Sequence, residues 1–390
     1  SLSSQPGGYT KYNIQITDNE KETVTISDIV FGELWLAAGQ SNMEFKLWQT
    51  PSAQEMLKNP NDEYLRFLNM PGNPEGGNNS GKVPYSPKTE IKSAYWGKGN
   101  DKDKLRQLSA VAYYFAARLR KELNVPVGVL NTPLGSTAIY SWLSREAIDG
   151  NNNVKTYLQS TNRYLKEENW NQAGNSNFKQ MTAMFNQKVA PLSVLNISGT
   201  IWYQGEDQSN EPAGTYRQAL GLLLHDYSKH FRFTNDSMPL IYAHLAPHYY
   251  GSGKIFDQLA YFSEDLSNAW RDHPSNMAQI PIYDLPLDFK YSSIIPGTAG
   301  DAAIHPMVKE PVGERMAQAA LGMVYGKSSE YTAPVYKSVS VSGGSLLVKF
   351  EHVGDGLLAK TPSVTYSAVS KDTSLNGFAI CGADGVYVPA

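Results

Sequence analysis

A short apolar run at residues 34–38 leads without a break into Gly39 and Ser41, and this junction limits the fold more than any other stretch. Such a run is typical of a strand buried on both faces, as in the parallel sheet of an α/β protein. These folds bind ligands at the carboxyl edge of the sheet, where a glycine permits the tight turn that exposes a nucleophile. The pattern therefore favours a catalytic role for Ser41. The alternative is a serine that only caps the next helix, a role that Ser41 and Asn42 both suit.

The rest of the sequence predicts strands and helices that alternate around this junction. The clearest helix is at residues 109–123, where an apolar stripe follows Ser109 as the expected cap. The other predicted helices span residues 156–190 (with a break at 170–177), 216–230 and 308–325, and the other predicted strands span 125–130, 197–203, 240–245 and 280–284. This order predicts one α/β domain over residues 30–328.

Period-two alternation at both ends of the chain predicts β structure outside that domain. The N-terminal arm, residues 1–29, has the alternation of a hairpin around a turn at residues 17–20. The C-terminal β region, residues 329–390, alternates on both sides of Gly343 and Gly344. That region is short for a sandwich, so we expect it to pair with the N-terminal arm or to be an incomplete domain.

The composition excludes several classes of partner and site. The 390-residue chain has a formal net charge of -3 and no block of Lys or Arg, which argues against a nucleic-acid or anionic-membrane partner. Cys381 is the only cysteine, so neither an intrachain disulfide nor a multi-cysteine zinc site is expected. The 24 Tyr and 7 Trp residues are typical of proteins that stack on sugars, although aromatic residues also fill cores.

The sequence has no apolar run long enough to span a membrane and no signal-peptide pattern at its start. We expect a periplasmic or secreted protein whose leader was removed before residue 1. A cytoplasmic protein is the alternative.

Polar segments lie at four predicted strand-to-loop edges, namely at Ser41, at Gly135, at residues 204–206 and at residues 301–305. A serine hydrolase requires a nucleophile, a base and donors for the oxyanion. His305 is the best placed of the seven histidines to act as the base, and the Gln204 amide with the backbone N–H groups of Ser41 and Gly135 are candidate donors. Taken alone, His305 could be an ordinary histidine at a helix start and Gly135 an ordinary tight turn.

Other chemistries fit the sequence less well. His244 and His248 are four residues apart, but Pro247 lies between them, so a helical metal pair is excluded. Glu206 and Asp207 are adjacent on an extended segment and point opposite ways, which argues against a glycosidase pair. We expect no cofactor and no metal.

Three motifs together resemble the sialate O-acetylesterase family, which are carbohydrate esterases of the SGNH-hydrolase fold. They are Gly39-Gln40-Ser41-Asn42-Met43, Trp202-Tyr203-Gln204-Gly205-Glu206, and Ile304-His305-Pro306 followed by Lys309, Gly313 and Arg315. The resemblance covers roughly residue 30 to the C-terminus, and three motifs in the family's order are far more specific than any one. It implies a three-layer α/β/α domain with a parallel sheet.

The resemblance also implies an activity, the removal of O-acetyl groups from sialic acid through an acetyl-enzyme. Ser41 would be the nucleophile and His305 the general base, with Ser41, Gly135 and Gln204 as the oxyanion stations. We assign the neighbouring Asn42 and Glu206 to substrate binding. The expected partner is an O-acetylated sugar, and no oligomeric state is predicted.

The acid behind His305 departs from the wider SGNH pattern, which has an Asp three residues before the His. Here that position is Ala302, and Asp301 lies four before. We predict Asp301, with Asp284 as the rival and a Ser–His dyad oriented by a backbone carbonyl as the third arrangement. The alternative functions are an esterase for acetylated xylan or another polysaccharide and, in another class, a non-catalytic carbohydrate-binding protein.

Overall fold

The computed structural model describes residues 5–19, 21–72, 83–91, 93–172, 178–247, 255–285, 304–328, 330–357 and 378–389. A seven-stranded sheet at its centre has the order β5-β4-β6-β3-β7-β8-β9. These strands are β3 (Glu33–Gly39), β4 (Asp62–Asn69), β5 (Tyr95–Gly99), β6 (Val127–Asn131), β7 (Gly199–Tyr203), β8 (Leu240–Ala243) and β9 (Met277–Ile280).

The strand before Ser41 lies in the middle of this sheet. β3 pairs in parallel with β6 on one side and with β7 on the other. All other neighbours are parallel too, except that the edge strand β5 runs antiparallel to β4. Because parallel strands end at the same edge, the residues after β3, β6 and β7 meet there. The predicted α/β class is confirmed, and the antiparallel edge is an addition to it.

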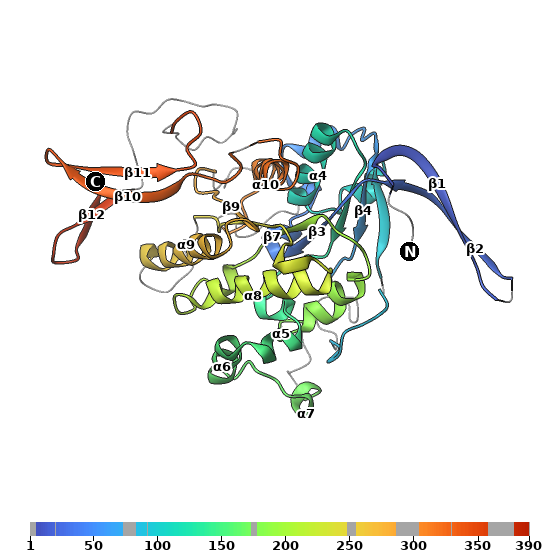
Figure 1. Ribbon diagram of the computed structural model, residues 1–390, viewed down its shortest axis with the longest axis horizontal. Helices are drawn as coiled ribbons and strands as arrows, with labels where there is room; N and C mark the ends of the chain where they lie inside the picture. Colours follow the sequence, from blue (N-terminus) through green and yellow to red (C-terminus); the bar gives the residue numbers. More distant parts are fainter. Residues whose placement is uncertain are drawn as a thin grey trace.

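Helices cover both faces of the sheet, as the predicted three layers require. Figure 1 shows α4 and α10 together on one face and α5, α8 and α9 on the other. The described helices are α1 (Ser41–Glu44), α2 (Ala53–Met56), α3 (Lys102–Leu105), α4 (Ala110–Leu123), α5 (Arg145–Gly150), α6 (Asn152–Ser160), α7 (Glu167–Trp170), α8 (Thr215–His230), α9 (Ile255–Asp272) and α10 (Glu310–Met323). Short turns of 3-10 helix are η1 (Leu47–Gln49), η2 (Ile139–Trp142), η4 (Ala190–Leu192), η5 (Glu206–Gln208) and η6 (Thr234–Asp236), and η3 (Phe185–Val189) is π-helical.

One predicted helix is confirmed, and two other predicted elements are wrong. The helix α4 is confirmed together with its cap, because the Ser109 side chain accepts the N–H of Ala112 at 3.2 Å. The predicted strand at 280–284 is wrong by several residues, since β9 ends at Ile280 and Pro281 has no N–H for a ladder bond. The predicted polar helix at 156–190 is wrong over most of its length, because only short helical segments occur there.

Both chain ends form separate hairpins. β1 (Gly8–Thr17) pairs with β2 (Thr23–Phe31), β10 (Val335–Ser342) with β11 (Ser345–Glu351), and β12 (Ala379–Cys381) with β13 (Tyr387–Pro389). Figure 1 shows the N-terminal and C-terminal hairpins at opposite ends of the molecule. The expected pairing between the two regions is therefore not found among the described residues.

His244, at the end of β8, is a buried histidine with two neutral partners. Its Nδ1 lies 2.9 Å from the Tyr283 hydroxyl, and its Nε2 lies 2.9 Å from Oε1 of Gln279. Burial lowers the pKa of His244 to about 4. In these contacts His244 has a structural role. The prediction that His244 and His248 do not form a metal pair is not tested, because His248 lies outside the described residues.

This histidine predicts a loss of stability in acid. Because the folded pKa is lower than the ordinary value of 6.5, the unfolded chain takes up the proton first, and stability is lost as pH falls from 6.5 towards 4. When the pH is lowered from 8 to 5, the unfolding free energy of His244→Gln should fall by about 2 kcal/mol less than that of the wild type. Urea unfolding at both pH values measures this, with His225→Gln, an exposed histidine, as the control. An equal acid loss in wild type and His244→Gln would contradict it.

Candidate active site

The turn after β3 presents Ser41 at the carboxyl edge of the sheet. Gly39 has a φ of 137°, a conformation that favours glycine, and the Gln40 N–H donates to the Tyr203 carbonyl at 3.0 Å. Ser41 is the first residue of α1, and the cap position is Gln40. The capping alternative for Ser41 is therefore wrong.

His305 lies beside this serine, although 264 residues separate the two in sequence. The distance from His305 Nε2 to Ser41 Oγ is 2.8 Å. Both residues are partly exposed, so a substrate can reach them. A serine hydroxyl within hydrogen-bond reach of an imidazole has the geometry of a nucleophile with its general base.

A buried polar network holds the His305 loop against the Ser41 turn. Asn42 Nδ2 donates to the carbonyl of Ile304 at 2.8 Å and to Oε1 of Glu206 at 2.5 Å. Lys309 Nζ donates to Oδ1 of Asn42 at 2.5 Å and lies 4.9 Å from the centre of the Phe45 ring. Asn42 thus joins the residue before His305, the strand end after β7 and the start of α10.

The charges of this network are unusual because solvent hardly reaches them. Lys309 is 1% exposed and Glu206 is 8% exposed. Burial lowers the pKa of Lys309 to about 7, a shift that the Glu206 carboxylate opposes. Burial also raises the pKa of Glu206, and no described residue donates to its Oε2. Asn42 and Glu206, both predicted from sequence to bind substrate, lie bonded to each other in this network next to Ser41.

The two buried charges are expected to stabilise the fold as a unit. Lys309→Met and Glu206→Gln should each lower the unfolding free energy by about 1–3 kcal/mol, because each alters a buried group that is hydrogen-bonded to Asn42. The double variant should lose clearly less than the sum of the two single losses. The exposed pair Lys229 and Glu146, treated in the same way, should lose about 1 kcal/mol or less. Additive losses at Lys309 and Glu206 in urea unfolding would contradict the coupling.

The predicted oxyanion stations differ in what they bind. The Gly135 N–H donates to Oε2 of Glu44 at 2.7 Å, so a carboxylate of α1 now occupies this donor. The Gln204 amide nitrogen is buried and lies 2.8 Å from Oε1 of Gln40, with further acceptors at Thr137 and Gln208. The Gly135 N–H can therefore act as an oxyanion donor only after the Glu44 carboxylate has moved away. The Gln204 side chain instead stabilises the turn that carries Ser41.

The acid behind His305 stays a prediction. Asp301 lies outside the described residues. Its rival Asp284 forms a two-point ion pair with Arg315, at 2.8 Å and 2.6 Å. That pair gives the Asp284 carboxylate a cationic partner of its own.

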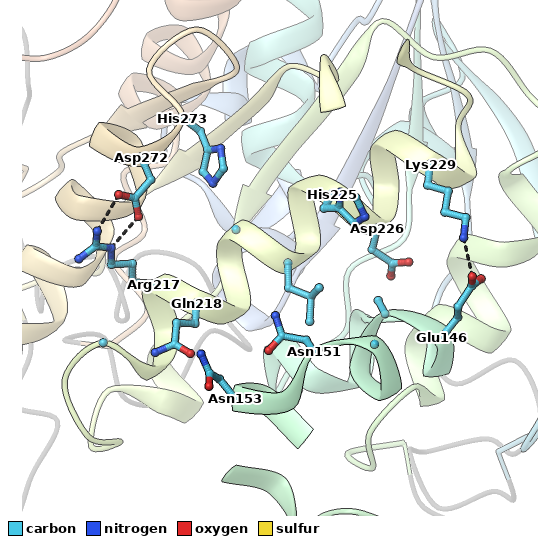
Figure 2. A pocket seen from close by; sticks show the side chains of 15 residues that line it. Glu146, Asn151, Asn153, Arg217, Gln218, His225, Asp226, Lys229, Asp272 and His273 are labelled. Atoms are coloured by element: carbon cyan, nitrogen blue, oxygen red, sulfur yellow. Dashed lines mark hydrogen bonds and ion pairs between the residues drawn. The ribbon is translucent and has the colours of Figure 1, made fainter. Parts of the chain in front are cut away.

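One pocket of the described residues lies away from the proposed catalytic pair. It has a volume of about 770 Å³ and lies between α8 and the segment α5–α6, and its lining includes neither Ser41 nor His305 (Figure 2). Four of its charged side chains form two ion pairs, Arg217 with Asp272 and Lys229 with Glu146, and Asp226 accepts hydrogen bonds from Ser144.

Among the described residues, no group of three or more His, Cys, Asp and Glu side chains could hold a metal ion. In the same part of the chain, no helix is both long and apolar enough to cross a membrane.

Glu44 and Lys188 were missed by sequence reasoning. Glu44 follows Ser41 by three residues, the spacing at which helical side chains share a face, and that signal was available. Lys188 is fully buried, donates to the Met70 carbonyl at 2.8 Å, and has a pKa that burial lowers to about 8. Nothing in a lone lysine within a polar segment indicates such burial.

Comparisons with known proteins bear on this site. The family model of carbohydrate esterases described as sialic acid-specific acetylesterase matches residues 32–279, a segment that includes Ser41, Gly135, Gln204 and Glu206 and ends before His305. A sialate O-acetylesterase of Homo sapiens is 22% identical over 366 residues, which span 86% of this chain and 62% of the human protein. A sialate O-acetylesterase of Mus musculus is 21% identical over 375 residues, 89% of this chain and 67% of the mouse protein.

One solved structure shares the fold along the whole chain. A carbohydrate acetylesterase from Xanthomonas citri superposes with a TM-score of 0.75 and 24% identity, and covers 100% of this chain and 76% of that protein. The family match covers more than half of the sequence and shows that the chain belongs to the sialic acid-specific acetylesterase family of carbohydrate esterases, which are carboxylic ester hydrolases.

Proposed function

We propose that the protein is a serine esterase that removes O-acetyl groups from sialic acid. The observation that carries the proposal is the 2.8 Å contact between Ser41 Oγ and His305 Nε2 at the carboxyl edge of the sheet. Family membership supports the ester substrate, and the names of the human and mouse relatives support sialic acid. The chain spans about 62% of the human relative's length, so the activity of that whole protein is proposed for this chain and not assigned to it.

The proposed reaction has two steps. His305 takes the proton of Ser41, whose oxygen attacks the acetyl carbonyl carbon, and the resulting oxyanion accepts the Ser41 N–H. The C–O bond to the sugar breaks, the sugar oxygen takes the proton from His305, and an acetyl-enzyme remains. His305 then takes a proton from water, whose oxygen attacks the acetyl carbon. The bond between that carbon and Ser41 Oγ breaks, Ser41 takes the proton back from His305, and acetic acid leaves and ionises to acetate. Gly135 adds a second donor once Glu44 has turned away.

Two other functions compete with this one. An esterase for acetylated xylan or another polysaccharide would use the same serine and differ in the sugar it binds. A non-catalytic carbohydrate-binding protein would bind glycans without turnover. Comparing acetate release from O-acetylated sialic acid and from acetylated xylan separates the first two.

Acetate release from a chromogenic acetate ester tests the chemistry itself. We expect Ser41→Ala to lower kcat/KM by at least about 10³-fold with an unchanged unfolding midpoint. Glycan binding without acetate release in the wild type would favour the binding protein. A periplasmic or secreted location remains a prediction from the sequence, and fractionation of the producing cells tests it.

A further inference from the structure

A second, smaller pocket lies next to the proposed catalytic turn. It has a volume of about 280 Å³, close to the lower limit of small-molecule sites, and its walls include Tyr140, Arg163, Lys179 and Asp207. An aromatic ring, two cationic side chains and a carboxylate thus face one space.

Two chain segments join this pocket to the Ser41 turn. A Cβ placed on Gly135 would lie 3.4 Å from the Cβ of Ser41, and Ala138, three residues further, lines the pocket. Three residues span at most about 11 Å, so the pocket begins within reach of a sugar whose acetyl group lies at Ser41. On the other wall, the Asp207 N–H lies 3.3 Å from Oε1 of Gln40, the residue before Ser41.

Arg163 is held in place but stays accessible. Its Nη1 donates to Oε1 of Glu211 at 2.6 Å, its Nε donates to Thr161 at 3.0 Å, and its guanidinium lies 5.2 Å from the centre of the Tyr140 ring. Its side chain is nevertheless 36% exposed. These bonds use two of the five N–H donors, and a guanidinium that is already fixed loses little entropy when it binds a carboxylate.

A polar side chain beside Arg163 lacks the partners that burial normally demands. Both ends of the Gln180 amide are shielded from solvent, and neither has a hydrogen-bond partner among the described residues. Gln180 also lines the pocket. Buried amides in native proteins nearly always have partners, so we expect Gln180 to turn its amide towards a polar ligand when one enters this pocket.

We propose that this pocket binds the acidic sugar of the substrate, with Arg163 as the residue that recognises its carboxylate. The inference rests on the proposed function for the identity of the substrate. In a sialic acid acetylated on its glycerol tail, the ester and the carboxylate lie at opposite ends of the molecule, so one sugar can reach Ser41 and Arg163 together. Asp207 on the same wall can accept bonds from sugar hydroxyls.

Binding of N-acetylneuraminic acid and of its methyl ester to the full chain, measured by calorimetry, tests this without any turnover. The wild type should bind the acid at least about tenfold more tightly than the methyl ester, since only the acid offers a carboxylate for a charge-assisted bond. Arg163→Gln should remove that preference, and Arg163→Lys should keep part of it. Arg217→Gln, at the larger pocket of Figure 2, is the matched control and should keep the full preference.

Equal affinity of the wild type for acid and methyl ester, or no binding of either, would overturn the proposal, and so would an undiminished preference in folded Arg163→Gln. The affinities of the wild type for the acid and for the methyl ester test the proposal even if Arg163→Gln does not fold. A failure here together with acetate release by Ser41 would indicate an esterase for neutral sugars. Acid binding without acetate release would instead refute the proposed esterase and leave the carboxylate site intact.

Discussion

Replacing His305 with glutamine is expected to lower kcat/KM for a chromogenic acetate ester by about 10⁴-fold or more. The Ser41 hydroxyl would lose the base that lies 2.8 Å from its oxygen, and both acylation and deacylation depend on that base. Because the His305 side chain is only partly buried, the unfolding midpoint should change little.

The matched control is His225→Gln. His225 is 60% exposed on α8 and binds Asp236, so its loss should leave kcat/KM within about twofold of the wild type. If His305→Gln kept more than a tenth of the wild-type kcat/KM, His305 would not be the base.

Gly39→Ala is expected to disrupt the site and the sheet edge together. A Cβ at this position would lie 2.2 Å from the carbonyl oxygen of Tyr203, and the φ of 137° is strained for any other residue. The clash falls where β3 meets β7, so the turn that carries Ser41 must move. A displacement of about 1 Å costs on the order of 10²-fold in rate, and we expect at least that loss in kcat/KM together with a fall of several degrees in Tm.

Gly150→Ala provides the comparison. Gly150 ends α5, has open space around its Cα, and lacks a positive φ, so alanine there should change stability by about 0.5 kcal/mol or less. Thermal unfolding and kcat/KM of the two variants should therefore differ clearly. Equal behaviour would mean that the Gly39 turn is not tightly constrained.

Ser41 and His305, the proposed catalytic pair, could be singled out from sequence because their signals are local. The two signals are a buried strand that ends in glycine and serine, and a histidine just before a helix. Each pattern indicates the same local structure in any α/β protein. The parallel sheet places Ser41 at its carboxyl edge, and the segment just before α10 brings His305 to it across 264 residues.

The surroundings of the pair could not be predicted, because they depend on packing between distant elements. Glu44 lies against Gly135, and the amide of Gln204 turns towards Gln40, only because the turns after β3, β6 and β7 converge. In the same way, the low pKa of Lys309 comes from burial that a lysine in a sequence does not reveal.

Two missed elements have different explanations. β4 was missed because its strand carries charges. Arg66 is accommodated there by bonds to Asp28 of β2, at 2.9 Å to its carboxylate, and to the Glu63 carbonyl at 3.2 Å. α9 carried a detectable signal, since Phe262, Leu266 and Trp270 are buried at helical spacing.

The central claim is that Ser41 carries the acetyl group during the reaction. Mixing the protein with a chromogenic acetate ester, quenching it rapidly with acid and mapping its peptides by mass spectrometry locates that group. We expect acetyl on the peptide that contains Ser41, with a burst of chromophore release, and neither in Ser41→Ala. Acetate release by Ser41→Ala at the wild-type rate, with no acetyl on the Ser41 peptide of the wild type, would contradict the account.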